Sequence, residues 1–195
     1  EGIRSEALIA GLDSVAEMTE ALATFFRYTI SQVENLVPLE DELANIENYY
    51  YIQQFRFGDK LALSIEYDCD EDLSELDILQ YRLPKLTLQP IVENAVRHGI
   101  REIGRQGKIL LKVQAVEDGV RITVKDNGKG IEKERLAEIM EKKTAAVGDS
   151  TGIGLDNVMS RLELYFQKKV ITIRSDGDNQ GTEVILDLPS RREES

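Results

Sequence analysis

The first third of the chain carries apolar residues at helical spacing. Between residues 5 and 34 neither Gly nor Pro occurs except for Gly11, and apolar side chains recur at steps of three and four. This period predicts an amphipathic helix. After Pro38 the segment LEDELANIENYYYIQQFRF predicts a second helix that ends near Gly58. The apolar stripe expected on this second helix consists of Leu43, Ile46, Tyr50 and Phe57.

From Lys60 onward the pattern changes to strands separated by helices. Helical spacing returns at about 86–98, 132–141 and 153–167, and short turns join neighbouring strands, which indicates hairpins rather than βαβ units. We therefore predict an α+β fold, a two-layer α/β sandwich with a mainly antiparallel sheet, preceded by N-terminal helices. The strand-like segments are KLALSIEY, GKILLKVQAV, VRITVKD, KVITIRS and TEVILDLP.

This pattern divides the chain into three expected parts. Residues 1–58 form a helical region, 59–190 a second domain, and 191–195 a frayed tail. Two consecutive helices without a sheet need a partner surface, and a second copy of the same helices is the simplest one. We therefore expect a homodimer formed through the N-terminal helices.

Composition narrows the class of protein. The net charge of −12 argues against nucleic acid or an anionic membrane surface as a partner, because both need a basic face. The single cysteine, Cys69, cannot form an intrachain disulfide and stands in the acidic stretch EYDCDEDLSELD, so we interpret it as incidental. No apolar run approaches the roughly 18–20 residues that span a bilayer, and no signal peptide is visible. These features fit a reducing, cytoplasmic setting.

The motif DNGKGI follows a predicted strand. Asp-Asn-Gly between apolar runs normally indicates a tight hairpin. The residues that follow, EKERLAEIM, have helical spacing instead, so we expect a loop with Gly128 and Gly130 that leads into a helix. Asp126 then lies at the end of the strand and faces an opening, where its carboxylate could accept a hydrogen bond from an exocyclic amine such as that of adenine.

A second glycine-containing loop, TGIGLDNVMSRL, opens a predicted helix. Gly152 and Gly154 let the backbone approach a ligand closely, and the first N–H groups of a helix can hold phosphate oxygens. A plain helix entry with flexible glycines is the alternative. Neither loop fits the dinucleotide-binding or P-loop patterns.

The third motif is LQPIVENAVRHG, which places an asparagine inside an apolar helix. Such a residue costs stability unless it has a task. The side-chain oxygen of Asn94 suits a hard cation, and a single protein ligand with phosphates and waters is a usual way to hold Mg²⁺. Arg97, one turn on, could meet a phosphate, whereas an Asn94 that merely points to solvent beside Glu93 is the alternative.

Taken in order, these motifs resemble those of the nucleotide-binding domain shared by gyrase, Hsp90, MutL and histidine kinases. ENAVRHG resembles the N box of that family, DNGKGI its first glycine box and TGIGL its second. The resemblance covers about residues 60–189 and implies the Bergerat (GHKL) sandwich, with ATP between the helix layer and a lid. The lid would be about 140–151, where Lys142 and Lys143 are candidates to reach the γ-phosphate.

Nearly the whole chain resembles sensor histidine kinases of the LytS/YesM type, through FFRYTI, VPLEDELANIENYYYIQQFRFGDKL and LPKLTLQPIVENAVRHGI. The resemblance implies ATP and Mg²⁺ as cofactors and a response regulator as partner. It implies that Asn94 ligates Mg²⁺, that Asp126 binds adenine, and that Thr182, in QGTEV, reaches adenine through water. Glu93 and Asn94 would be catalytic, and Arg97 would lie near the phosphates. The glycines that would shape the nucleotide loops are Gly128, Gly130, Gly152 and Gly154.

One departure from this family concerns the phosphoacceptor histidine, which its members carry on the first helix. The only histidine here is His98, in the nucleotide-binding helix and just before Gly99, a candidate C-cap. In-line attack on the γ-phosphorus favours an acceptor on a separate helix, so we expect a structural role for His98. We expect the acceptor, sensor and membrane segments to be missing, the full-length protein to lie in the cell membrane, and this part to be unable to phosphorylate itself.

Three other functions share parts of this pattern. A gyrase- or Hsp90-like ATPase carries a general-base glutamate four residues before the Mg²⁺ asparagine, where this chain has Pro90. A serine kinase of the anti-sigma type shares the three motifs, but the two N-terminal helices favour a sensor kinase. A non-catalytic helical dimerisation module would have purely structural glycine loops, and nucleotide binding would exclude it.

Overall fold

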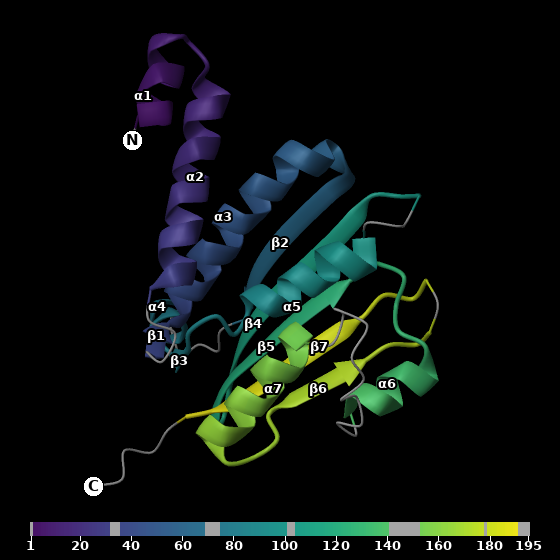
Figure 1. Cartoon of the computed structure of the whole chain (residues 1–195). Helices are drawn as coiled ribbons and strands as arrows, with labels where there is room; N and C mark the ends of the chain where they lie inside the picture. The colour runs from purple at the N-terminus through teal and green to yellow at the C-terminus, as the bar shows by residue number, and fades with distance from the viewer. Residues whose placement is uncertain are drawn as a thin grey trace, which may run out of the picture.

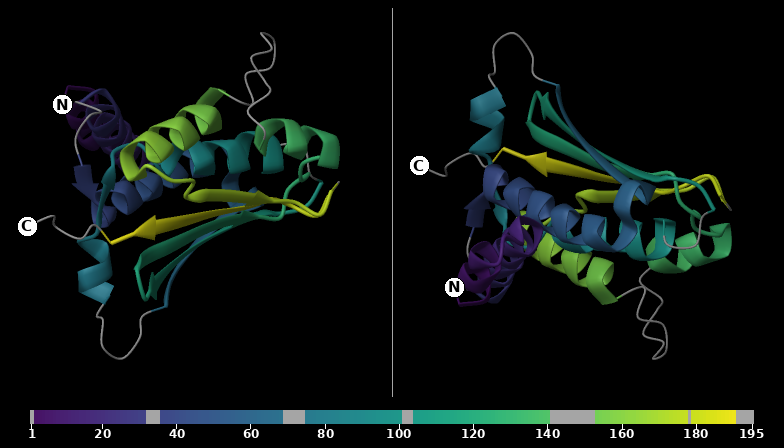
Figure 2. Two further views of the ribbon diagram at one scale, coloured as in Figure 1. Left: turned by 90° about the horizontal axis from the view of Figure 1, so that it is seen from below. Right: turned by 90° about the horizontal axis from the view of Figure 1, so that it is seen from above.

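The computed structural model describes residues 2–31, 36–68, 75–100, 104–140, 153–177 and 179–190. Helices cover one face of a five-stranded sheet, which gives two layers (Figures 1 and 2). The helices are α1 (Gly2–Ile9), α2 (Asp13–Ile30), α3 (Leu39–Phe57), α4 (Glu75–Leu79), α5 (Gln89–Asn94), α6 (Lys133–Met140) and α7 (Ile153–Phe166), with a 3₁₀ turn η1 (Gly58–Lys60) and a π-helical turn η2 (Ala95–Ile100). The strands are β1 (Leu36–Pro38), β2 (Leu61–Asp68), β3 (Arg82–Pro84), β4 (Gly107–Val116), β5 (Gly119–Asp126), β6 (Ile171–Arg174) and β7 (Glu183–Pro189).

The large sheet has the strand order β2-β4-β5-β7-β6. Three of its pairings are antiparallel, and the hairpins expected between β4 and β5 and between β6 and β7 are present, so the predicted fold class is confirmed. β2 and β4, which lie far apart in sequence, run parallel, so the sheet is mainly but not wholly antiparallel, as predicted. Parallel neighbours need a long crossover, and here α5 lies within that connection.

Alternation along the central strands separates a core face from a solvent face. On β5 the side chains of Val120, Ile122 and Val124 are buried, whereas Arg121 and Lys125, at alternate positions on the other face, are exposed. Arg121 pairs with Asp187 on the neighbouring strand at 2.6 Å. Such alternation of buried apolar and exposed polar side chains is typical of antiparallel strands that helices cover on one face.

The second predicted helix is confirmed as α3, with its end at Gly58. Leu43 and Ile46 of its predicted stripe are buried, and Tyr50 and Phe57 are partly buried. α3 packs against β2 and α5, so the core is continuous across residue 58. The domain boundary that we placed there stays a prediction.

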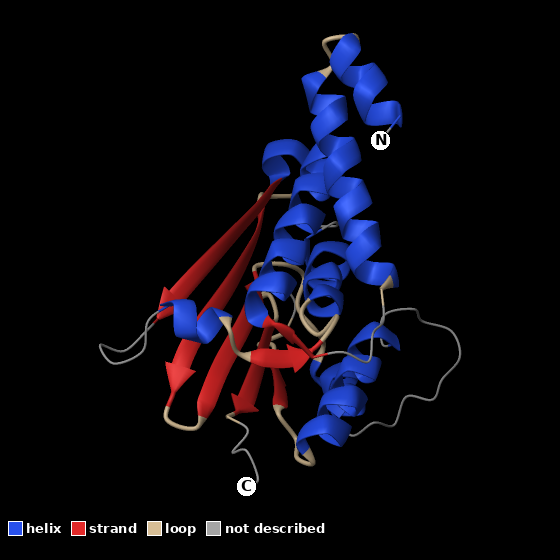
Figure 3. Ribbon diagram, turned by 90° about the vertical axis from the view of Figure 1, so that its left-hand side faces the viewer, coloured by secondary structure: helices blue, strands red, loops and turns tan. Residues whose placement is uncertain are grey.

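The first predicted helix is wrong in its extent. It is divided into α1 and α2, and α2 ends at Ile30, where Ser31 is extended. Gly11 has φ +69°, a conformation that favours glycine, and the chain turns there so that α1 folds back on α2 (Figure 3). α2 then lies along α3, so both N-terminal helices find contacts within their own chain.

Candidate nucleotide-binding site

Asp126 is the last residue of β5 and lies on the core face of the sheet. It continues the alternation that buries Ile122 and Val124 on this strand, and its own exposed fraction is 5%. Its backbone N–H donates to the carbonyl of Thr182 at 2.9 Å, which brings these two predicted site residues together. Asp126 is therefore more enclosed than we expected for a residue that faces an opening.

The carboxylate of Asp126 is a hydrogen-bond acceptor in a dry environment. Its Oδ1 accepts the N–H of Gly128 at 2.8 Å. Burial raises the pKa of Asp126 to about 6, against the lowering effect of the backbone hydrogen bonds with Gly128 and Thr182. A desolvated carboxylate of this kind can select an N–H donor, such as an exocyclic amine.

The loop after β5 leads into α6, as predicted, and packs against the loop between β6 and β7. Gly130 has φ +80°, and a Cβ there would collide with the carbonyl oxygen of Gly177. Ser175 links the two loops, because its Oγ accepts the N–H of Ile131 at 2.9 Å and donates to the carbonyl of Gly181 at 2.7 Å. Loop packing alone therefore explains why residue 130 is glycine.

Asn127 is a residue of this loop that sequence reasoning missed. Its Oδ1 accepts the N–H of Lys108 at 2.7 Å and its Nδ2 donates to the carbonyl of Gln106 at 3.0 Å. These bonds tie the loop to β4 next to Asp126. The partners lie 19 and 21 residues away in sequence, so no local pattern marked them.

Asn94 is the last residue of α5, where the helix widens into the π-helical turn η2. Ile91, Val92, Ala95 and Val96 are buried, whereas Glu93 and Asn94 are half-buried. The π-helical turn packs against β4 and β5, the strand that ends in Asp126. π-helical turns are rare and occur frequently at functional sites, which agrees with the task predicted for Asn94.

The start of α7 lies beside the start of α5. A Cβ on Gly154 would lie 3.7 Å from the Cβ of Pro90, an ordinary contact distance. Packing between the helices therefore does not require glycine at 154, and its part in a nucleotide loop stays a prediction. Gly152 and the expected lid, with Lys142 and Lys143, lie outside the described residues.

The remaining predicted residues differ in exposure. Arg97 is exposed within η2, and His98 has a described backbone in the same turn but no described side chain. Within the described ranges, no three His, Cys, Asp or Glu side chains gather to hold a metal ion. A Mg²⁺ ion held by one asparagine oxygen and by phosphates needs no such cluster.

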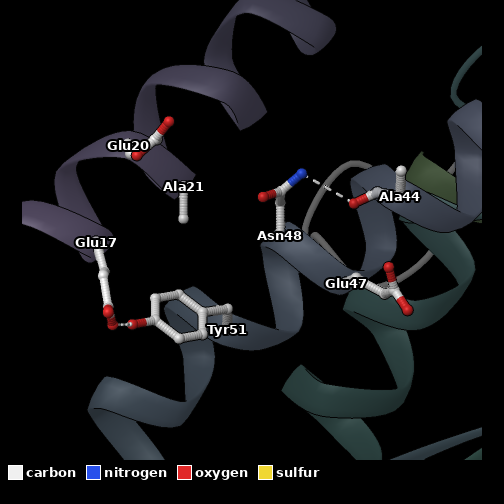
Figure 4. Close-up of a pocket in the computed structure, with 7 residues that line it drawn as sticks. All are labelled: Glu17, Glu20, Ala21, Ala44, Glu47, Asn48 and Tyr51. Atoms are coloured by element: carbon white, nitrogen blue, oxygen red, sulfur yellow. Dashed lines mark hydrogen bonds between the residues drawn. The ribbon is translucent and has the colours of Figure 1, made fainter. Parts of the chain in front are cut away.

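A separate pocket of about 440 Å³ lies between α2 and α3, away from the three motifs (Figure 4). Its carboxylates make it unsuitable for a triphosphate. It is lined by Glu17, Glu20, Ala21, Ala44, Glu47, Asn48 and Tyr51.

Comparison with protein families decides the assignment. Residues 83–192, more than half of the chain, match the family described as histidine kinase-, DNA gyrase B-, and HSP90-like ATPases. The chain belongs to this ATPase family. Residues 1–61 match a second family, described as histidine kinase.

Several curated relatives of this chain are sensor kinases. It is 32% identical over 181 residues to the sensor histidine kinase YpdA of Escherichia coli, and 30% identical over 180 residues to the sensor histidine kinase YesM of Bacillus subtilis. Each alignment covers 92% of this chain but only 29% and 28% of the relative. The sensor protein LytS of Bacillus anthracis is 33% identical over 171 residues, 87% of this chain and 28% of the relative. The predicted LytS/YesM resemblance is confirmed, and the chain spans less than a third of these relatives.

Solved structures support the fold. The catalytic domain of the histidine kinase ThkA has a TM-score of 0.56 at 22% identity, covering 80% of this chain and 97% of that domain. The kinase domain of a blue-light activated histidine kinase of Erythrobacter litoralis has a TM-score of 0.53 at 16% identity, covering 93% and 82%. Among the described helices none is both long and apolar enough to cross a membrane.

Proposed function

We propose that this chain is the part of a sensor histidine kinase that binds Mg·ATP and delivers its γ-phosphoryl group to a histidine. Imidazole nitrogen forms the new bond to phosphorus while the bond to the bridging oxygen breaks and ADP leaves. The aspartate of a response regulator then receives the phosphoryl group. The family assignment supports ATP as the ligand. The relatives, which are named sensor histidine kinases, support transfer of the phosphoryl group to a histidine and then to a response regulator.

One observation carries the assignment of the site. The buried carboxylate of Asp126 closes the core face of β5 beside Thr182, and the turn that follows Asn94 packs on the same strand. Asp126 would accept a hydrogen bond from the adenine amine, and Thr182 would reach adenine through water. Asn94 and Arg97 would hold the phosphate end, with Gly128, Gly130, Gly152 and Gly154 shaping the loops. Mg²⁺, when bound to Asn94, would neutralise charge on the transferred phosphoryl group.

Three further features of the full-length protein are part of the proposal. The N-terminal helices form a homodimer, for which the apolar surface of α1 and α2 provides the contact. This part lies in the cytoplasm. The relatives YpdA and YesM are more than three times as long as the segment that matches this chain. In a full-length protein of similar length, other segments would anchor it in the membrane.

Calorimetry with Mg·ATP tests the site directly. We expect the wild-type chain to bind Mg·ATP, Asn94→Ala to lose the Mg²⁺-dependent part of the affinity, and Asp126→Asn to bind about tenfold or more weakly through loss of a charged acceptor. Asn48→Ala, on α3 and outside the site, is the matched control. Wild-type affinity in both site variants would refute the assignment, and steady ATP turnover would favour a hydrolase.

A further inference from the structure

A buried chain of hydrogen bonds joins α3 to Glu93, the residue before Asn94. The Nδ2 of Asn45 donates to the Oε1 of Gln89 at 2.7 Å, and the Nε2 of Gln89 donates to the Oε1 of Glu93 at 2.7 Å. Asn45 and Gln89 are 3% and 7% exposed. Gln89 and Glu93 are four residues apart on α5 and therefore lie on one face of that helix. The chain runs from the protein interior to a half-buried carboxylate.

The direction of this chain follows from the chemistry of its last member. An ionised carboxylate only accepts hydrogen bonds, so the amide of Gln89 must turn its NH₂ toward Glu93. Its oxygen then faces Asn45, which must donate. An asparagine meets this need, whereas an aspartate of the same shape does not.

Asn45 has a feature that stability alone does not explain. Its Oδ1 is buried and has no hydrogen-bond partner among the described residues. A buried polar atom in this state lowers stability, and an apolar side chain of similar volume would avoid the cost. The residue is therefore better explained by what its NH₂ does.

We propose that Asn45 and Gln89 are positioning residues that hold the carboxylate of Glu93 for phosphoryl transfer. Glu93 accepts a hydrogen bond from one imidazole nitrogen of the phosphoacceptor histidine while the other nitrogen attacks the γ-phosphorus. The proton of the first nitrogen remains between the ring and Glu93, and ADP leaves. This inference rests on the proposed function, because it assigns a task within the same reaction.

The test compares two substitutions of Asn45 in the full-length kinase, which contains the present polypeptide and the phosphoacceptor histidine. Asn45→Asp reverses the direction of the chain and turns the Gln89 oxygen toward Glu93, so we expect kcat for autophosphorylation to fall by about ten- to a hundredfold with little change in KM for ATP. Asn45→Leu removes the donor without placing a second acceptor beside Gln89, so we expect a smaller loss of kcat, with a modest loss of thermal stability because the buried Gln89 oxygen keeps no donor. If Asn45 were needed only for packing, Asn45→Leu would lose more kcat than Asn45→Asp, because Asp is closer to Asn in shape.

Asn48→Asp is the matched control, because Asn48 lies one turn further along α3 and its Nδ2 donates to Ala44 within that helix (Figure 4). We expect wild-type kcat for this variant. A second comparison places Asn45→Asp in a Glu93→Gln background, where it should reduce kcat no further, because both changes act on one group.

Three outcomes would overturn the proposal: wild-type kcat in Asn45→Asp, a loss that is fully additive with Glu93→Gln, or a loss of kcat that is matched by loss of folding in Asn45→Leu. Failure of the proposed function itself would give a different result. It would appear as absence of Mg·ATP binding or of histidine phosphorylation in the wild-type protein.

Discussion

Asp126, the residue proposed to bind adenine, lowers the stability of the fold at neutral pH. The pKa of its carboxyl rises from 3.8 to about 6 because the side chain is buried. The folded state therefore holds the proton more tightly than the unfolded state does. Its contribution to stability is full below about pH 3.8, falls as the pH rises, and is lost above about pH 6.

The variant Asp126→Asn should remove this dependence, because a neutral amide has no proton to lose. Relative to wild type, its free energy of unfolding should rise by about 2–3 kcal/mol as the pH increases from below 3.8 to above about 6. Thermal unfolding across this pH range measures the difference. Asp59→Asn, at an exposed position outside the site, is the matched control. A constant offset between Asp126→Asn and wild type would contradict the pKa shift of Asp126.

At this scale the sequence predicted the residues of local motifs and missed those that act through distant contacts. Asp126 could be found because a strand pattern ends at it and a glycine loop follows. Asn127, Asn45 and Gln89 could not, because their hydrogen bonds join segments that only the fold brings together. The roles of all the predicted site residues, including Asp126, Asn94, Gly152 and those of the lid, stay predictions.

Among the elements, α3 and α5 depend on one buried carboxylate for their relative placement. Glu42 of α3 is 1% exposed and accepts the N–H groups of Leu86, Thr87 and Leu88 at 2.6–2.8 Å, just before α5 begins. The hydroxyl of Tyr28 on α2 donates to the same carboxylate at 2.5 Å. Leu86 has φ +58°, an unfavourable conformation for leucine that these bonds help to maintain.

Glu42→Gln should therefore destabilise the protein, because the amide NH₂ would face N–H donors and leave at least one of them without an acceptor. We expect a loss of about 2–4 kcal/mol in the free energy of unfolding, measured by urea denaturation. Glu47→Gln, on the exposed side of the same helix, should change it by less than about 0.5 kcal/mol. Equal stability of the two variants would show that Glu42 does not hold the entry to α5.

Elements with a long, regular period could be predicted, and those set by tertiary contacts could not. α3 was predicted because its apolar stripe is continuous and Gly58 ends it. The three-residue strands β1 and β3 carry too little pattern to find, and they form only because Leu36–Pro38 meets Arg82–Pro84. The parallel pairing of β2 with β4 likewise depends on where α5 crosses the sheet, which spacing along the chain does not reveal.

For the whole molecule, the exposed apolar side chains indicate which surface a second copy would contact. We expected both N-terminal helices to need an external partner, but α3 finds its partner in the sheet domain. What remains is an exposed apolar row along α2, at spacings of seven and four residues, typical of one helix face. It consists of Val15, Leu22, Phe26 and Ile30, and the exposed apolar side chains of α1 are Ile3, Leu8 and Ile9.

The double substitution of Phe26 and Ile30 by serine tests this surface as the proposed homodimer contact. These side chains are 53% and 80% exposed, so their replacement should leave the fold of the monomer intact. Each protomer would lose both apolar side chains, and we expect the dissociation constant to rise by at least about a hundredfold, measured by sedimentation equilibrium. Leu164→Ser is the control, because Leu164 is 82% exposed on α7 and should not affect association. A wild-type chain that stays monomeric at high concentration would contradict this contact, and a dimer that survives the double substitution would place it on another face.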